Sequence, residues 1–204
     1  MKKIVKNAMI LFAITLVSGL ALGFAYELTK EPIAVAEENR KQNAYKEVIT
    51  DADSFTEYSD FDADTAAKCV SDAGISNCTI DEVVTGMAGS EAKGYIITVT
   101  DGEGYNGDIQ FTVGIGTDGK ILGISFLSIS ESPGLGMTAK DDPSWKEQYY
   151  NKDVSSFTVV KSSSSADDEI NAISGATISS KAITNGVNAA LAYYNAELGG
   201  ASND

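Results

Sequence analysis

The sequence predicts an α+β protein, in which a single N-terminal transmembrane helix precedes a domain with a mainly antiparallel sheet and flanking helices. The first observation is an apolar run without any charge, from Asn7 to Tyr26. The second is a series of strand-like stretches between residues 80 and 129, two of which are joined by an Asp-Gly turn. The third is a set of apolar residues at helical spacing over residues 179–198.

The composition excludes several classes of function. The chain has 204 residues and no histidine, so it has no Ser-His-Asp or Cys-His nucleophile system and lacks the commonest transition-metal ligand. From Glu27 onward the balance is 12 basic residues (15 less Lys2, Lys3 and Lys6) against 29 acidic ones. Nucleic acid requires a basic surface, so no nucleic-acid partner is expected. We expect neither a metal site nor a side-chain acid–base catalyst.

The apolar run Asn7–Tyr26 has the length of a membrane span. Twenty helical residues cover about 30 Å, the thickness of a bilayer's hydrocarbon core. Lys2, Lys3 and Lys6 precede it and predict a cytoplasmic N-terminus, with the rest of the chain on the outer face. A cleaved secretory signal ending near Gly23-Phe24-Ala25 is the alternative. We favour a retained anchor, because the run is long for a signal peptide.

The residues after the anchor form a connecting region. Ile33–Val48 predicts an amphipathic helix, Asp51–Asp64 an acidic loop, and Ala66–Ala73 a short helix ended by Gly74. Cys69 and Cys78 can form a disulfide or remain as two free thiols, and the sequence does not distinguish these cases.

Four strands follow, at Ile80–Met87, Gly94–Thr100, Ile109–Ile115 and Ile121–Ile129. Alternating apolar residues and the turn 117–120 indicate antiparallel pairing, which differs from a doubly wound nucleotide fold. Beyond the sheet, we expect a short helix opening at Pro143, with Trp145 and Tyr149 in the core, and a strand at 157–160.

The segment Ser174-Gly175-Ala176-Thr177 stands immediately before the C-terminal helix. Small residues leave room for a ligand to approach the Thr177 hydroxyl. Free N–H groups and the helix dipole favour an anion such as phosphate at a helix N-terminus. The alternative is an ordinary N-cap, since threonine and serine are preferred capping residues.

The same segment resembles the flavinylation site of the FMN-binding domain family. This family includes the C subunit of the sodium-pumping NADH:quinone oxidoreductase and the G subunit of the Rnf complex. The resemblance implies that Thr177 carries FMN through a phosphoester bond formed by a flavin transferase, with Ser174, Gly175 and Ala176 as the rest of the motif. The family's aspartate three residues before the serine is replaced here by Asn171.

A second motif supports the resemblance. The loop Glu131-Ser132-Pro133-Gly134-Leu135-Gly136 is similar to the family's Glu-Thr-Pro-Gly-Leu-Gly loop, with Ser132 in place of threonine. The resemblance implies that Ser132 hydrogen-bonds the cofactor and that Leu135 packs on its ring. Gly134 and Gly136 would allow the ring to approach closely. We expect Glu131 to be a loop-organising or edge group, because a carboxylate close to the flavin would disfavour its anionic reduced form.

Taken together, these features predict an anchor at residues 1–30, a connecting region at 31–92, an FMN-binding domain at 93–198 and a flexible tail at 199–204. The resemblance implies an electron-transfer subunit that relays electrons within an ion-translocating ferredoxin:NAD oxidoreductase complex. Its partners would be other membrane subunits, the flavin transferase and membrane lipid. The alternatives are the related subunit of a sodium-pumping NADH:quinone oxidoreductase and an anchored extracellular binding or assembly module without a cofactor.

Overall fold

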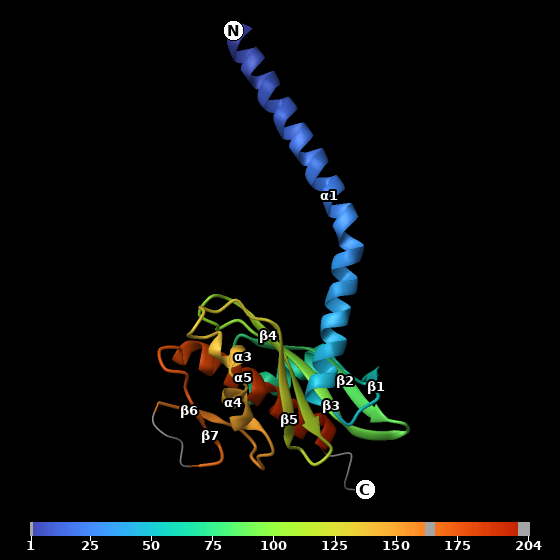
Figure 1. Cartoon of the computed structure of the whole chain (residues 1–204), viewed down its shortest axis with the longest axis vertical. Coiled ribbons are helices and arrows are strands. Elements are labelled where there is room, and N and C mark those ends of the chain that lie inside the picture. The colour runs from blue at the N-terminus through green and yellow to red at the C-terminus, as the bar shows by residue number, and fades with distance from the viewer. Residues whose placement is uncertain (1, 162–165, 200–204) are drawn as a thin grey trace. The chain divides into compact units, whose positions relative to one another are not determined.

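The computed structural model describes residues 2–161 and 166–199 and confirms the predicted α+β class (Figure 1). Internal contacts divide the chain into two compact units, residues 1–42 and 43–204. All five strands of the main sheet therefore lie in the second unit, although two of them fall within residues 31–92, where the sequence suggests a connecting region. Residues 200–204 of the expected tail lie outside the described part of the chain.

Helix α1 (Lys2–Val48) contains the expected membrane anchor. Within the first unit its apolar side chains are exposed, for example Leu11 and Phe24 at 64% and 68%. On length and composition, α1 is the one helix among the described residues that could cross a membrane. The separate helix expected at 33–48 is not observed, because α1 continues through Pro32. Strong helix formers (Ala, Glu and Lys) dominate the residues after Pro32, so the single lost backbone hydrogen bond does not end the helix.

The main sheet is an antiparallel meander with the strand order β1-β2-β3-β4-β5. The strands are β1 (Ser54–Glu57), β2 (Cys78–Ala88), β3 (Glu91–Asp101), β4 (Ile109–Gly116) and β5 (Ile121–Ser128). The last four confirm the four predicted strands. Strand β1 corrects the expected acidic loop at 51–64: its four residues pair with residues 84–87 of β2, and its acidic side chain remains exposed at the sheet edge.

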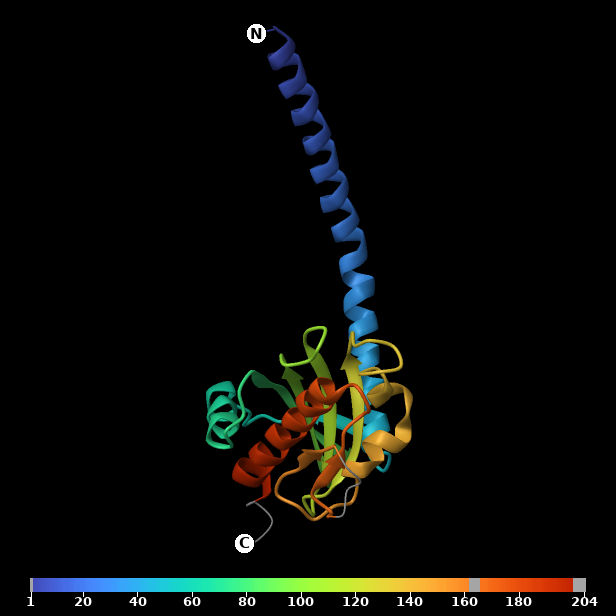
Figure 2. The ribbon, with the colours of Figure 1, turned by 90° about the vertical axis from the view of Figure 1, so that its left-hand side faces the viewer.

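One face of the sheet is covered by helix α5 (Thr177–Tyr193), which crosses the strands in Figure 2. The core on this face contains Ile97, Val99 and Phe111 from the strands together with Ile183 and Val187 from α5. Helix α2 (Ala63–Asp72) packs beside them and begins earlier than expected, because Asp62 caps its N-terminus. The π-helical turn η2 (Tyr194–Leu198) continues α5 and completes the predicted C-terminal helix.

The other face of the sheet is covered by the last turn of α1. Tyr45, Val48 and Ile49 pack there with Val84 and Ile96 from β2 and β3. Of the segment 33–48, for which the sequence predicts an amphipathic helix, only the end is buried. Ala44 and Val48 are buried, whereas Ile33 is 52% exposed.

Two glycines allow α1 to come close to the sheet. Gly114 and Gly123 face each other across β4 and β5. A Cβ atom on Gly114 would lie 2.7 Å from the Val48 carbonyl oxygen, and one on Gly123 would lie 2.8 Å from the Val48 Cα. Real Cβ atoms do not approach other atoms so closely, so any larger residue at either position would displace the end of α1.

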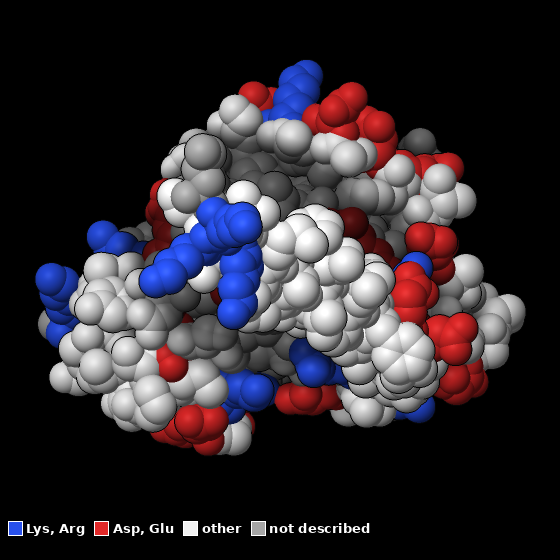
Figure 3. Space-filling view, turned by 90° about the horizontal axis from the view of Figure 1, so that it is seen from above, with Lys and Arg blue, Asp and Glu red and all other residues white. Residues whose placement is uncertain are grey.

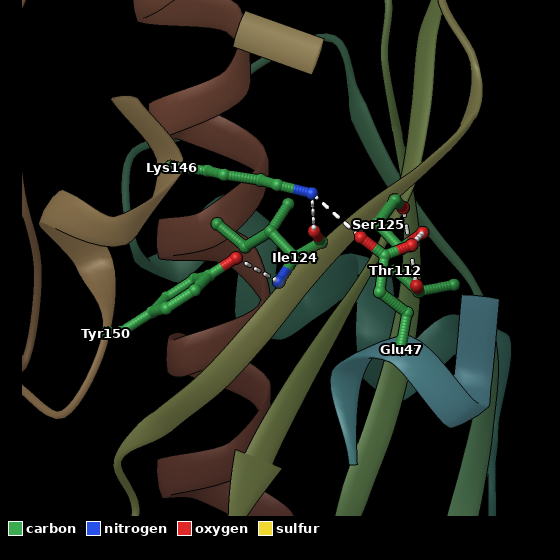
Figure 4. Close-up of polar contacts among 6 residues, drawn as sticks. All are labelled: Glu47, Thr112, Ile124, Ser125, Lys146 and Tyr150. Atoms are coloured by element: carbon green, nitrogen blue, oxygen red, sulfur yellow. Dashed lines mark hydrogen bonds and ion pairs between the residues drawn. The ribbon is translucent and has the colours of Figure 1, made fainter. Parts of the chain in front are cut away.

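A group of polar side chains fastens the same turn to the sheet (Figure 4). The Lys146 ammonium donates to Glu47 Oε1 at 2.9 Å and to the Ile124 carbonyl at 3.0 Å. The Ser125 hydroxyl donates to Glu47 Oε2 at 2.6 Å. Burial alone would raise the pKa of Glu47, but the hydrogen bonds from Ser125 and Lys146 outweigh it and hold this pKa below its ordinary value.

Short elements connect β5 to α5. They are α3 (Thr138–Asp141), α4 (Pro143–Lys146), η1 (Glu147–Tyr149), β6 (Thr158–Val160) and β7 (Glu169–Asn171). Pro143 opens α4 as predicted, and Trp145 and Tyr149 are buried in the core. Strand β7 was not predicted; it pairs in parallel with β6 and leads directly to α5.

Both cysteines are free thiols, so the disulfide alternative is not realised. Burial raises the pKa of the Cys78 thiol to about 12, and the neighbouring Asp101, Asp81 and Glu103 carboxylates add to this effect. A thiol that remains protonated is a poor nucleophile, so Cys78 acts as a small apolar core residue.

Candidate functional site

The two segments singled out in the sequence come together around one cavity of about 440 Å³. The 131–136 loop follows β5, and the 174–177 segment opens α5, so about forty residues separate them along the chain. Ligand pockets in proteins commonly measure about 300–1,000 Å³. The cavity is lined by Tyr105, Glu131, Ser132, Leu135, Gly136, Gly175, Ala176, Thr177, Ile178 and Ser179.

The loop at 131–136 is held by hydrogen bonds to its own backbone. The Ser132 carbonyl accepts from the N–H groups of Leu135 at 3.1 Å and Met137 at 3.3 Å, with Gly134 at a φ of +73°. Gly136 has no room for a side chain, because a Cβ atom there would lie 2.5 Å from the Ser179 hydroxyl oxygen. The loop and the first turn of α5 therefore touch at this glycine.

The segment before α5 is held just as firmly. The Ser180 hydroxyl is fully buried; it donates to the Ala176 carbonyl at 2.9 Å and accepts from the Ile173 N–H at 3.0 Å. Upstream, the Trp145 indole donates to the Asn171 carbonyl at 2.8 Å, and Gln148 accepts from the Asn171 side chain at 3.1 Å. The backbone of residues 171–176 is thus held in place at both ends.

Thr177 is the first residue of α5, and it does not cap this helix. The N-cap position belongs to Ala176, which makes no side-chain capping hydrogen bond. The ordinary N-cap alternative is therefore wrong for Thr177. Its half-buried side chain lines the cavity, where the first-turn N–H groups have no partner within the helix. This position favours a ligand with an anionic group close to the hydroxyl.

The rim of the cavity is apolar and exposed. Leu135 is 43% exposed, Ile178 54% and Tyr105 66%, all high values for such side chains. A flat, largely apolar ligand could cover these three residues, while its anionic end lies near Thr177. The cavity thus combines an exposed apolar rim with a helix N-terminus that favours an anionic group.

The expected site residues do not all reach the cavity. Ser132, Leu135, Gly136, Gly175, Ala176 and Thr177 line it, whereas the exposed residues Ser174 and Gly134 do not. Ser174 precedes the turn at Gly175, whose φ is +77°, and Gly134 forms the turn of the 131–136 loop with a φ of +73°.

Four lining residues are not among the cofactor-binding residues expected from the sequence, namely Tyr105, Glu131, Ile178 and Ser179. Of these, Glu131 was expected to organise its loop, and its Oε1 does accept hydrogen bonds from the N–H groups of Tyr105 and Asn106. Tyr105 lies in Gly104-Tyr105-Asn106-Gly107, a turn-rich stretch whose position at the cavity depends on the fold. Ile178 carried a usable signal, because it falls outside the apolar spacing of α5 and therefore had to face away from the core. Among the described residues, no group of three or more Cys, Asp or Glu side chains could hold a metal ion.

Two family models match the chain. The model of the FMN-binding domain matches residues 104–192, which include both cavity segments. The model of the RnfG N-terminal region matches residues 1–48, the whole of α1.

Two similar proteins align with nearly the full length of this chain. The G subunit of the Na⁺-translocating ferredoxin:NAD⁺ oxidoreductase complex of Acetobacterium woodii is 33% identical over 95% of this chain and 92% of its own. The G subunit of the proton-translocating complex of Clostridium ljungdahlii is 30% identical over 90% and 88%. Among solved structures, the C subunit of the Na⁺-translocating NADH-quinone reductase of Parabacteroides distasonis is 26% identical, with a TM-score of 0.46 over 55% of this chain and 60% of its own.

Proposed function

The chain belongs to the family of G subunits of ion-translocating ferredoxin:NAD oxidoreductase complexes, and we propose that it carries FMN covalently, through a phosphoester bond to Thr177. It is a membrane-anchored electron-transfer subunit with an FMN-binding domain, and it works with other subunits of such a complex. The observation that carries the proposal is the position of Thr177. Its hydroxyl opens α5 without capping it and lines a cavity whose rim is apolar.

The residues around Thr177 fit an FMN molecule attached there. The N-terminus of α5 offers N–H groups to the phosphate, and Gly175 and Ala176 leave space beside it. Leu135 would pack against the isoalloxazine ring, and the Ser132 hydroxyl would hydrogen-bond the cofactor. FMN, when bound, supplies the reversible electron transfer, while the protein binds and orients it.

Attachment requires a second enzyme. A bond between Thr177 Oγ1 and phosphorus forms as the hydroxyl loses its proton and a leaving group departs from an activated FMN donor. We infer that a separate flavin transferase binds this donor and takes up the hydroxyl proton, because the chain has no histidine to act as the base beside Thr177. The half-buried hydroxyl and the exposed Ser174 leave the segment accessible to such an enzyme.

We further propose that the N-terminus is cytoplasmic and that the FMN domain lies on the outer face of the cell membrane. Lys2, Lys3 and Lys6 precede the apolar run, and the acidic domain follows it. A covalent tether prevents loss of the cofactor from a domain that faces away from the cytoplasm. Electrons would then pass between this FMN and redox centres in neighbouring membrane subunits.

The first prediction tests the attachment residue. The full chain, co-expressed with a flavin transferase, should give a protein band that fluoresces under ultraviolet light after denaturing electrophoresis. The Thr177→Ala variant should lose this fluorescence completely, because the acceptor oxygen is gone. Thr177→Ser should keep it, since the serine hydroxyl occupies the same place.

The matched control is Thr117→Ala, which removes an exposed threonine from the turn between β4 and β5. It should fluoresce as strongly as the wild type. Fluorescence that survives in Thr177→Ala would place the linkage elsewhere. A wild-type protein that stays colourless would instead favour a binding or assembly module without a cofactor.

A further inference from the structure

We infer that the buried carboxylate of Glu131 lowers the reduction potential of the flavin held in the cavity. This inference rests on the proposed function, because it assigns a second residue to the same site. Of the described residues that line the cavity, Glu131 is the one that carries a carboxylate. Its side chain is almost completely buried, with 5% exposed, although it belongs to a surface loop.

The glutamate is fixed in place by the backbone of the neighbouring loop. Glu131 Oε1 accepts from the N–H of Tyr105 at 2.7 Å and from that of Asn106 at 3.4 Å. Gly104 makes this wrapping possible, since a Cβ atom there would lie 2.9 Å from the same oxygen. These contacts therefore hold the Glu131 carboxylate beside the cavity.

The second carboxylate oxygen of Glu131, Oε2, does not take part in holding the 104–106 loop. Oε2 would lie 2.7 Å from a Cβ atom on Gly136, the cavity residue that also touches Ser179. None of the described residues donates a hydrogen bond to Oε2. Holding the 104–106 loop needs only one acceptor oxygen, which a glutamine would provide equally well. The negative charge is thus not required by the contacts that fix this side chain.

A fixed negative charge beside the cavity affects a ligand that gains electrons. Reduction adds negative charge to the flavin or requires a proton to offset it, and a nearby carboxylate disfavours the added charge. The effect is strong where water is excluded and weak between exposed groups, which salt screens. Glu131 should therefore influence the potential more than the many surface carboxylates of this acidic domain.

The experiment compares reduction potentials in full-length, covalently flavinylated protein by spectroelectrochemical titration at one pH and ionic strength. Glu131→Gln removes the charge and keeps the acceptor for Tyr105 and Asn106. It should shift the two-electron equilibrium towards the reduced form at least tenfold, or about 30 mV more positive. Glu91→Gln is the control: it removes an equal charge from an exposed position at the far end of the eleven-residue strand β3. It should leave the potential unchanged.

Glu131→Asp gives an independent test and remains informative if the glutamine variant does not fold. It keeps the charge but shortens the side chain, so its potential should stay within threefold of the wild type in equilibrium terms. An unchanged potential in Glu131→Gln, or an aspartate variant shifted by tenfold or more, would overturn the inference and leave the Thr177 linkage intact. The absence of covalent flavin from the wild type would instead refute the proposed function, and the inference with it.

Discussion

At the residue scale, Thr177 and Asp101 each carry an oxygen without a hydrogen-bond partner among the described residues, and the two differ in their surroundings. Thr177 opens α5 with its hydroxyl directed at a cavity, where an external group can meet it. Asp101 lies at the end of β3 and is fully buried; Oδ1 accepts from the Glu103 N–H at 2.8 Å, while Oδ2 has no partner in the described part of the chain. The Thr177 hydroxyl is thus accessible to a ligand, whereas the buried Oδ2 of Asp101 lowers the stability of the fold.

Asp101 should make stability depend on pH. Burial is the main cause that raises its pKa from 3.8 to about 6, and the nearby Glu103 and Asp108 carboxylates contribute. Between about pH 4 and 6 the folded state therefore binds a proton that the unfolded state has lost. The free energy of unfolding should fall as pH rises through this window, and the loss is complete above pH 6.

Asp101→Asn should remove this penalty and keep the acceptor for Glu103. Thermal unfolding in detergent should show a gain of about 1 kcal/mol at pH 7, after allowance for solvent screening, and a flatter pH profile between 4 and 6. Asp51→Asn, at an exposed position, should change neither quantity. An Asp101→Asn profile that kept the wild-type slope would show that Asp101 does not titrate in this range.

At the element scale, the sequence predicted those strands and helices whose form is determined by local residue patterns. Strands β2 to β5 were recognisable because their apolar residues alternate and an Asp-Gly turn joins the last two. Strands β1 and β7 were not, because segments of four and three residues owe their form to the strands beside them. The unbroken course of α1 through Pro32 depended on the helix formers around it rather than on the proline alone.

The end of α1 offers a test of how an element is fastened. Lys146→Met removes the ammonium, itself only 12% exposed, that binds Glu47 and the Ile124 carbonyl. We expect a loss of about 1–2 kcal/mol at pH 7 in thermal unfolding, because the Ile124 carbonyl loses its donor and Glu47, whose side chain is 55% exposed, loses a solvent-screened cation. The pKa of Glu47 is lowered in the fold, so its contribution is present above its unfolded pKa and disappears as pH falls through the folded value.

The matched control is Lys152→Met, which breaks a surface pair with Asp167. Exposed ion pairs contribute about 0–1 kcal/mol, so this variant should cost clearly less than Lys146→Met. Equal losses in the two variants would mean that the Glu47 contact is no stronger than an ordinary surface pair.

At the scale of the whole molecule, the site could be predicted in parts but not as a unit. The two motifs were visible in the sequence, yet only the packing of α5 beside the 131–136 loop joins them at Gly136. The place of Tyr105 and Glu131 at the cavity could not be predicted, because it depends on the loop that enters β4. The acidic character of the domain followed from its composition. Figure 3 shows acidic side chains in several clusters along the edge of the face in view.

The orientation of the chain gives the last prediction. In intact spheroplasts, an external protease should digest residues from Glu27 onward if, as we propose, the lysines before the apolar run keep the N-terminus in the cytoplasm. Replacing Lys2, Lys3 and Lys6 with glutamine should reduce the digested fraction. Protection of the domain in the wild type would reverse the topology. An intact mass that begins near Tyr26 would show that the apolar run is a cleaved signal.

The strand order described above also governs how the protein is made. Every strand of the main sheet pairs with its neighbour in the chain, and β2 to β5 are joined by short connections. These four strands can therefore form hairpin by hairpin as synthesis proceeds, with little entropy lost in closing long loops. Helix α5 comes last and brings the second wall of the cavity with it. A nascent chain whose α5 residues have not yet left the ribosome can form the sheet but lacks one wall of the cavity. Any ligand that needs both walls of this cavity can therefore bind only after α5 has packed against the sheet, late in the folding of the domain.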